Sequence, residues 1–442
     1  MVGSAEAAAL ELESRYLAAF APSVVQVQSL MNKLLMKKLM VRAWNLWCPT
    51  VGPIGSRLGK GSRIAEAMLG VGVLWSIGGV LLTPSMKFYF NMVLLFGYLP
   101  ALWLSVARRR ELVHVLSSHR EAWLLLALFG WAALSLLWAE GVEEPFNVLK
   151  RVSLFMLLVL GWVLWGRSDE RRLRLSLLSL VTLAGAYSLL ALLLQPHYDA
   201  HRLNGFGGFL DNPNSAAYAV AFIVVMGVPL VPRKGWQQLP WVTLLAAALL
   251  YVGLCGSRGA LLALTVTAVL SLLLVPGRVA KLLPLLLLLG GGALFFFEPA
   301  LILRGDSERL ELLRSAWPLV REHFWVGVGL GGDYAVSGPG GIYHRGAHNF
   351  LVHTSIQYGV PSLLVFLVMW FMVGLRAWCC RTRALGLSVL LLWVFSSVAM
   401  QFDVFSLWER TRAMWLMPWV VILLGLCLER WPQARPAIME PR

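Results

Sequence analysis

The chain has 442 residues, of which 58% are hydrophobic and 14% are charged, and its formal net charge is +15. Because ordinary globular domains carry roughly 25% charged residues, this composition excludes an ordinary soluble fold. We predict an all-α, polytopic integral membrane protein, and we interpret the basic residues as topology signals before any nucleic-acid-binding role. The five cysteines are scattered without the spacing of a zinc site or a disulfide framework.

The N-terminal segment, residues 1–63, shows no basic, apolar and small-residue pattern of a cleavable signal peptide. We therefore expect the first apolar span to direct membrane insertion. Residues 24–47 combine helically spaced basic residues with apolar ones, which predicts an amphipathic helix lying on an anionic membrane surface. The alternative is a poorly ordered basic tail, because short isolated helices are marginal in water.

The apolar runs that follow predict the transmembrane helices. A hydrocarbon core about 30 Å thick requires roughly 20 apolar residues per helix, and this rule predicts about twelve spans. Their approximate extents are 64–83, 87–107, 121–139, 146–166, 173–194, 214–231, 239–255, 259–276, 282–297, 350–375, 384–402 and 412–429. The predicted organisation is a cytoplasmic N-terminal segment (1–63), nine spans (64–297), one large loop containing helices (298–349), three spans (350–429) and a cytoplasmic tail (430–442).

The orientation follows from the basic residues, because one set of alternate loops is much richer in them and belongs in the cytoplasm. These loops contain Arg108, Arg109, Arg110, Arg167, Arg171, Arg172, Arg174, Arg233, Lys234, Arg278, Lys281, Arg376, Arg381 and Arg383. The loop at 298–349 then faces the outer side, although it holds five arginines and three histidines. Since long polar loops are usually functional, we predict that it forms the active site.

Two arginines outside this loop are candidates for binding an anion. Arg258 lies in the turn CGSRGALLAL between two short spans, where a charge usually marks a site. Its planar fork of donors suits phosphate, and the alternative is snorkelling to lipid headgroups. Arg202 lies in the outer loop QPHYDAHRLNGFGGFLDNPNSAA, in which Asn214 could simply cap the next helix.

A third basic site is Lys150 and Arg151, one turn into the fourth predicted span. Charged groups at such depth pair with one another or face a wet cavity. Glu143 and Glu144 in the preceding loop are candidate partners, and an anion contact is the only role that we assign to the two basic residues.

The long loop itself contains a predicted amphipathic helix from Ser307 to about His323, with Asp306 or Ser307 capping its start. Arg309 projects from its first turn, and its apolar stripe consists of Leu310, Leu313, Trp317, Val320 and Phe324. The run VGVGLGGDY follows. It predicts a flexible turn rather than a dinucleotide fingerprint, since no strand precedes it.

The loop ends in YHRGAHN, directly before the tenth predicted span. Histidine is the side chain most readily poised as a base near neutral pH, so His348 could take a proton from an acceptor hydroxyl. The alternative is a structural histidine beside a helix that Asn349 caps. Arginines without Asp or Glu clusters argue against a divalent-metal site, and they suit a leaving pyrophosphate.

Four segments, in this order, resemble the O-antigen ligase and polymerase superfamily of bacterial inner-membrane glycosyltransferases. They are GFGGFLDNPNSAA, the turn CGSRGALLAL, the stretch from SERLELLRSAW to VGVGLGG, and RGAHNFLVHTSIQYGVPSLLVFL. The resemblance covers about 202–365, and the flanking spans match only in number and apolarity.

This resemblance implies that a glycan moves from an undecaprenyl-pyrophosphate-linked donor to a sugar hydroxyl at the periplasmic face of the inner membrane, without a metal or other cofactor. By position, His348 matches the family's essential histidine and Arg258 matches an arginine proposed to bind pyrophosphate. Arg202 and Arg309 match further basic positions. Candidates for acceptor or phosphate contacts are Arg345, Asp403, Arg410 and Arg412. Gln357 stands where many relatives carry an acid, which weakens any scheme that uses a carboxylate there.

Within the superfamily the acceptor distinguishes the activities. Ligation onto lipid A-core is our first hypothesis, because basic outer residues suit a phosphorylated acceptor. The alternatives are an O-antigen polymerase and a protein O-oligosaccharyltransferase. A lipid transporter is the alternative from another class, although the sequence shows no internal repeat. The expected partners are the lipid-linked donor, lipid A-core and membrane lipids, and no nucleic acid.

Overall fold

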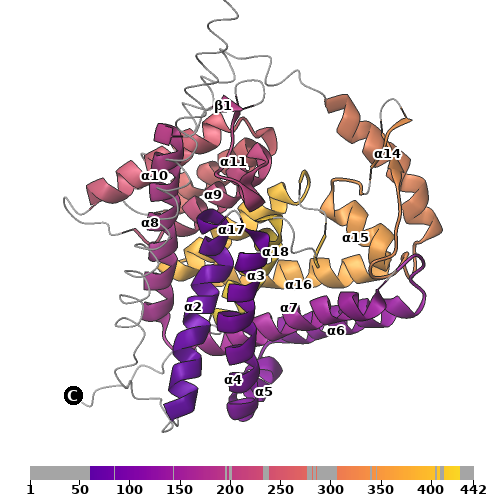
Figure 1. The fold of residues 1–442 in the computed structure, drawn as a ribbon, viewed down its shortest axis with the longest axis horizontal. Helices are drawn as coiled ribbons and strands as arrows, with labels where there is room; N and C mark the ends of the chain where they lie inside the picture. Colours follow the sequence, from indigo (N-terminus) through magenta and orange to yellow (C-terminus); the bar gives the residue numbers. More distant parts are fainter. Residues whose placement is uncertain are drawn as a thin grey trace, which may run out of the picture. The chain divides into compact units, whose positions relative to one another are not determined.

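The computed structural model describes residues 60–83, 85–142, 144–194, 197–198, 202–231, 238–275, 281, 285, 306–338, 341–344, 346–403, 406–408 and 413–428. The chain divides into two units, residues 1–63 and residues 64–442. Almost every described residue belongs to the second unit, which is mostly helical (Figure 1).

The described helices are α2 (Lys60–Leu82), α3 (Met86–Val93), α4 (Leu99–Ala107), α5 (Arg109–Ser118), α6 (Arg120–Leu134), α7 (Pro145–Gly166), α8 (Glu170–Leu194), α9 (Pro213–Gly227), α10 (Leu239–Leu254), α11 (Arg258–Leu274), α14 (Asp306–Glu322), α15 (Phe350–Tyr358), α16 (Val360–Cys379), α17 (Ala384–Ala399) and α18 (Leu416–Cys427). Two short antiparallel pairs accompany them. They are β1 (His197–Tyr198) with β2 (Arg202–Leu203), and β3 (Val336–Ser337) with β4 (Tyr343–His344).

Six helical stretches among the described residues are long and apolar enough to cross a membrane. They are Gly61–Leu82, Met86–Ala107, Arg120–Leu137, Pro145–Gly166, Glu170–Leu194 and Val360–Cys379. Five further predicted spans correspond to shorter apolar helices of 10–17 residues, and the ninth, 282–297, lies outside the described residues. The chain therefore has the helices of a polytopic membrane protein.

Two of the short helices, α9 and α18, are buried inside the second unit. Every residue of α18 is buried, as is every residue of α9 from Ala216 to Gly227. Helix α17 packs against α9, α11, α16 and α18, and α7 packs against α18 (Figure 1). Surrounding protein therefore covers α9 and α18, whereas α10 and α11 each expose apolar residues such as Leu250 and Leu273.

The predicted tenth span, 350–375, is two helices and not one. Gly359 breaks it with a φ of +82°, a conformation that favours glycine. The carbonyls of Phe324 and Trp325, just after α14, meet this break, and Phe324 O accepts the N–H of Val360 at 2.7 Å. Helix α15 therefore belongs structurally to the loop, and only α16 is long enough to span.

The predicted loop helix is confirmed within one residue as α14, Asp306–Glu322. Its packed face, however, is not the predicted stripe. Leu312, Ala316 and Val320 form a buried cluster with Val336, Ala347 and Ile356. Most of the predicted stripe is exposed, namely Leu310, Leu313, Trp317 and Phe324. The helix has two apolar faces, and periodicity alone does not distinguish the face that packs on the loop.

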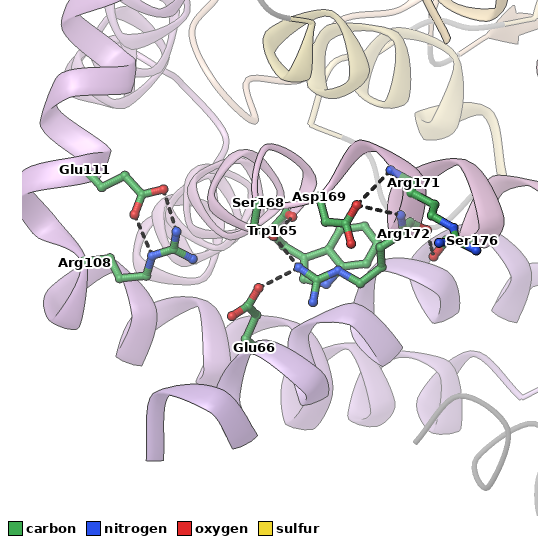
Figure 2. Close-up of polar contacts among 9 residues, drawn as sticks. All are labelled: Glu66, Arg108, Glu111, Trp165, Ser168, Asp169, Arg171, Arg172 and Ser176. Carbon is green, nitrogen blue, oxygen red and sulfur yellow. Dashed lines mark hydrogen bonds and ion pairs between the residues drawn. The ribbon is translucent and has the colours of Figure 1, made fainter. Parts of the chain in front are cut away.

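At the basic loops, the arginines hold acidic and aromatic partners (Figure 2). Arg172 Nη2 donates to Glu66 Oε1 at 2.6 Å, and its guanidinium lies 5.3 Å from the Trp165 ring. Asp169 Oδ1 caps α8 by accepting its first backbone N–H groups at 2.9 and 3.2 Å. Arg108 pairs in two-pronged fashion with Glu111 at 2.8 and 2.5 Å.

A second buried ion pair, between Arg376 and Glu121, joins α16 to α6. Arg376 donates from Nε and Nη2 to both carboxylate oxygens of Glu121, at 2.7–2.9 Å. Arg167 lies 3.1 Å from His119 Nε2 and also donates to the carbonyl of Leu426. These arginines hold helices together, in addition to any role in topology.

Candidate active site

Arg202 is fixed beneath the turn that carries Arg258. From β2, its Nε donates to the carbonyl of Cys255 at 2.8 Å and its Nη2 donates to Asn214 Oδ1 at 2.5 Å. Asn214 is therefore not the cap of α9. Asn212 takes that position, since its Oδ1 accepts the N–H of Asn214 at 2.8 Å. The predicted asparagine cap of α9 exists, but Asn212 provides it and not Asn214.

Arg258 is the first residue of α11 and is exposed. The preceding Ser257 is the N-cap by position, but its side chain makes no capping hydrogen bond and its buried Oγ has no hydrogen-bond partner among the described residues. A helix N-terminus carries a partial positive charge and attracts anions. The start of α11 therefore combines an exposed cation with the helix dipole, and Arg202 lies against the same turn.

Arg309 and Asp403 form an ion pair. Arg309 Nη2, from the first turn of α14, lies 3.2 Å from Asp403 Oδ1, in the turn after α17. The guanidinium also lies 5.5 Å from the Phe402 ring. Asp403 Oδ2 is buried and has no hydrogen-bond partner in the described part of the chain. The pair is partly exposed, 39% for the arginine and 14% for the aspartate, so it is accessible to a ligand.

Packing connects the Arg309–Asp403 pair to the start of α11. Gly259 follows Arg258, and a Cβ there would lie 3.2 Å from Phe402 Cβ and would overlap the hydroxyl of Tyr218. Only a residue without a side chain allows α11 to approach the turn at this distance. The first turns of α11 and α14, which carry Arg258 and Arg309, therefore both lie near Phe402.

His348 is held next to the same turn. Asn349 caps α15, as one sequence interpretation predicted, by accepting the N–H groups of Leu351 and Val352 at 3.0 and 3.1 Å. Its Nδ2 donates to the backbone and side-chain oxygens of Gln401 at 3.2 and 3.3 Å. His348 itself has a φ of +48°, which is uncommon for a residue with a side chain and is found most often at functional sites.

Asp403 belongs to the turn 401–403 and pairs with Arg309, and the residues that follow Arg258 and His348 contact the same turn. Arg202 joins them indirectly, since it bonds the Cys255 carbonyl in the turn that leads to Arg258. The other three candidates, Arg345, Arg410 and Arg412, lie outside the described residues. Sequence reasoning missed Phe402 and Gln401, which connect the parts. Their position directly before Asp403 was the only available signal.

Lys150 and Arg151 have different surroundings in the structure. Lys150 donates to Asn147 Oδ1 at 2.7 Å, and Asn147 in turn donates to Glu144. The predicted link to the acidic loop is thus indirect, through an asparagine. Arg151 lines a cavity, as the second interpretation allowed.

Comparison with known families gives a match to part of the chain. Residues 242–367 match the family model described as O-antigen ligase. The matched segment contains Arg258, Arg309 and His348, whereas Arg202 and Asp403 lie outside it. No curated protein matches the chain. Within residues 242–367, the chain is therefore similar to the O-antigen ligase family.

Proposed function

We propose that this protein is an O-antigen ligase. It is an inverting, metal-independent glycosyltransferase that moves O-antigen polysaccharide from undecaprenyl pyrophosphate to lipid A-core at the periplasmic face of the bacterial inner membrane. The observation that carries the proposal is that the segments bearing Arg258, Arg309 and His348 meet at the turn that carries Asp403. The family match of residues 242–367 supports it.

The membrane frame of the proposal has about twelve spans, with the cytoplasmic segments at 1–63 and 430–442 and the catalytic loop at 298–349 on the periplasmic side. The six long apolar helices support this frame. The site residues come from loops that the charge pattern assigns to one side, and the paired arginines of Figure 2 come from the other.

Arg258 and Arg309 bind the pyrophosphate of the donor in this scheme. Arginine suits this task because its planar donors match phosphate oxygens and its charge persists at all physiological pH values. Arg202 has two donors engaged with Cys255 and Asn214, so it contributes positive charge and holds the turn that presents Arg258. Charge fixed in advance stabilises the leaving group without reorganisation during the reaction.

His348 is the general base of the reaction. Its imidazole takes the proton of the acceptor hydroxyl, and the hydroxyl oxygen forms a bond to the anomeric carbon of the donor. The bond between that carbon and the phosphate oxygen breaks, and its electron pair leaves on undecaprenyl pyrophosphate. Attack opposite the leaving group inverts the anomeric configuration. A positioned base of this kind contributes about 10²–10⁴-fold.

The test uses cells that lack the protein and that also make O-antigen. A lipopolysaccharide gel is run together with an assay of lipid-linked glycan. The proposal predicts core without O-antigen and polymer accumulating on the undecaprenyl carrier. Core bearing a single repeat would indicate a polymerase. An unchanged lipopolysaccharide ladder would contradict both ligation and polymerisation, and loss of glycan from protein in that case would indicate a protein O-oligosaccharyltransferase.

A further inference from the structure

A cavity lined by Arg151 has no role in the scheme above. It has a volume of about 380 Å³ and is enclosed by α7, the turn at 330–334, α15 and the segment 406–408. Ligand pockets commonly have volumes of about 300–1,000 Å³. The side chains that matter for its chemistry are Arg151, Asp333, Tyr334, Gln357, Ser406 and Trp408.

The walls of this cavity provide both hydrogen-bond donors and acceptors. Arg151 and Asp333 bring opposite charges to it. Gln357 is buried, and its Nε2 donates to the carbonyls of Gly329 and Gly332, which leaves the amide oxygen as an acceptor for another donor. The side chains are therefore suited to a ligand whose groups both donate and accept, as hydroxyl groups do.

Trp408 is the second, independent sign of a ligand. It is 4% exposed, and its indole Nε1 is buried without a hydrogen-bond partner among the described residues. The Tyr358 hydroxyl is its neighbour, but the two make no hydrogen bond of normal geometry. A buried donor without a partner is costly. Phe129 packs on the Trp408 ring at 4.8 Å, so the indole is held rigidly at the cavity wall.

Tyr334 links this cavity to the His348 loop. Its hydroxyl lies 2.5 Å from His353 Nδ1, and it also interacts with the backbone of Ala347, the residue before His348. Burial raises the pKa of Tyr334 well above its ordinary value, so the phenol keeps its proton at physiological pH and remains a donor. A ligand in the cavity could therefore contact Tyr334, which in turn contacts the loop that carries His348.

We infer that this cavity is a subsite for one pyranose ring of a glycan substrate, an inference that rests on the proposed function. A sugar ring offers hydroxyl groups that donate and accept, together with an apolar face that packs on aromatic side chains. Trp408 and Tyr334 supply the aromatic side chains, and Arg151 and Asp333 supply a charged donor and a charged acceptor for the hydroxyl groups. The ring comes from either the donor glycan or the acceptor core, since both present the same chemistry.

The test measures binding without catalysis. Full-length protein carrying His348→Ala is placed in lipid nanodiscs and titrated with two soluble probes: delipidated core oligosaccharide and an O-unit oligosaccharide. Arg151→Gln and Trp408→Phe are added separately, and Lys150→Gln is the matched control. Lys150 is the neighbour of Arg151 on α7 but bonds to Asn147 and does not line the cavity.

We expect Arg151→Gln to weaken the binding of one probe about tenfold, the effect of losing one charged hydrogen bond. Trp408→Phe should weaken the same probe several-fold while preserving the aromatic ring, and Lys150→Gln should leave binding within twofold. The probe that is affected identifies the ring as acceptor or donor. Unchanged binding of both probes in correctly folded Arg151→Gln protein, or no binding of either probe to the parent, would overturn the subsite.

Failure of the subsite and failure of the proposed function are distinguishable. The binding measurement needs no turnover, and glycan transfer by the chain with an intact His348 is measured separately. If transfer occurs and Arg151→Gln binds both probes normally, only the subsite is wrong. If no transfer occurs but the probes bind in an Arg151-dependent way, the subsite stands as a glycan site and the ligase proposal fails.

Discussion

The guanidinium of Arg309 lies 3.2 Å from the carboxylate of Asp403, a residue 94 positions away. The pair joins the first turn of the loop helix α14 to the turn that follows α17. Because Arg309 is 39% exposed, the ion pair contributes little to stability, and its main effect is to orient the arginine.

We therefore predict that Asp403→Asn lowers the rate of glycan transfer about tenfold while leaving the melting temperature of the protein nearly unchanged. The amide keeps the shape of the carboxylate but no longer attracts the cation. Transfer rates and thermal melting of purified protein in detergent check this together. A variant with full activity would show that the ion pair does not position Arg309.

The two asparagines before α9 should separate activity from stability. Asn214→Ala removes the acceptor that holds Arg202 and should lower transfer about tenfold. Asn212→Ala removes the helix cap and should cost about 1 kcal/mol of stability with little effect on the transfer rate. Parallel measurements of transfer and thermal melting test both, and equal effects of the two changes on transfer would refute the assignment.

Arg202→Lys tests the same contact from the other side. A lysine ammonium is a single point donor and does not reproduce the bonds to both Cys255 and Asn214, so transfer should again fall about tenfold despite the conserved charge. If the lysine variant matched the parent in transfer rate, charge alone would explain the role of Arg202.

The break between α15 and α16 should tolerate no side chain. Gly359→Ala places a Cβ against the Trp325 carbonyl at a φ of +82°, and such strain costs about 1–3 kcal/mol. Gly130→Ala is the control, because the position in α6 has open space around it and a helical backbone. Thermal melting should show a large decrease for the first variant only, and equal melting temperatures would contradict the described joint.

Local features of this protein could be predicted from the sequence. The bounds of α14, the cap at Asn349 and five of the six long spans depend on apolar runs and capping residues that are close in sequence. The break at Gly359 could have been predicted as well, because Gly-Val-Pro is a recognisable helix boundary.

Long-range features could not be predicted in this way. The partners of Arg202 and Arg309 are acceptors from other loops, and no local pattern identifies them. The packed face of α14 was misassigned because the helix has apolar residues on two faces, and its contact with α15 and β3 determines which face is buried. Residue chemistry suggested His348 as a base or as a structural residue, and the resemblance to a known superfamily favoured the base.

The central claim is that His348 takes the proton of the acceptor hydroxyl. The most direct measurement is transfer of glycan from purified undecaprenyl-pyrophosphate donor to lipid A-core by wild-type protein, His348→Ala and the control His344→Ala, whose ring lies 6.0 Å from that of His348. The account predicts that His348→Ala loses at least about 10²-fold in rate at unchanged donor affinity, whereas His344→Ala stays close to wild type. Transfer by His348→Ala at the wild-type rate would contradict the account.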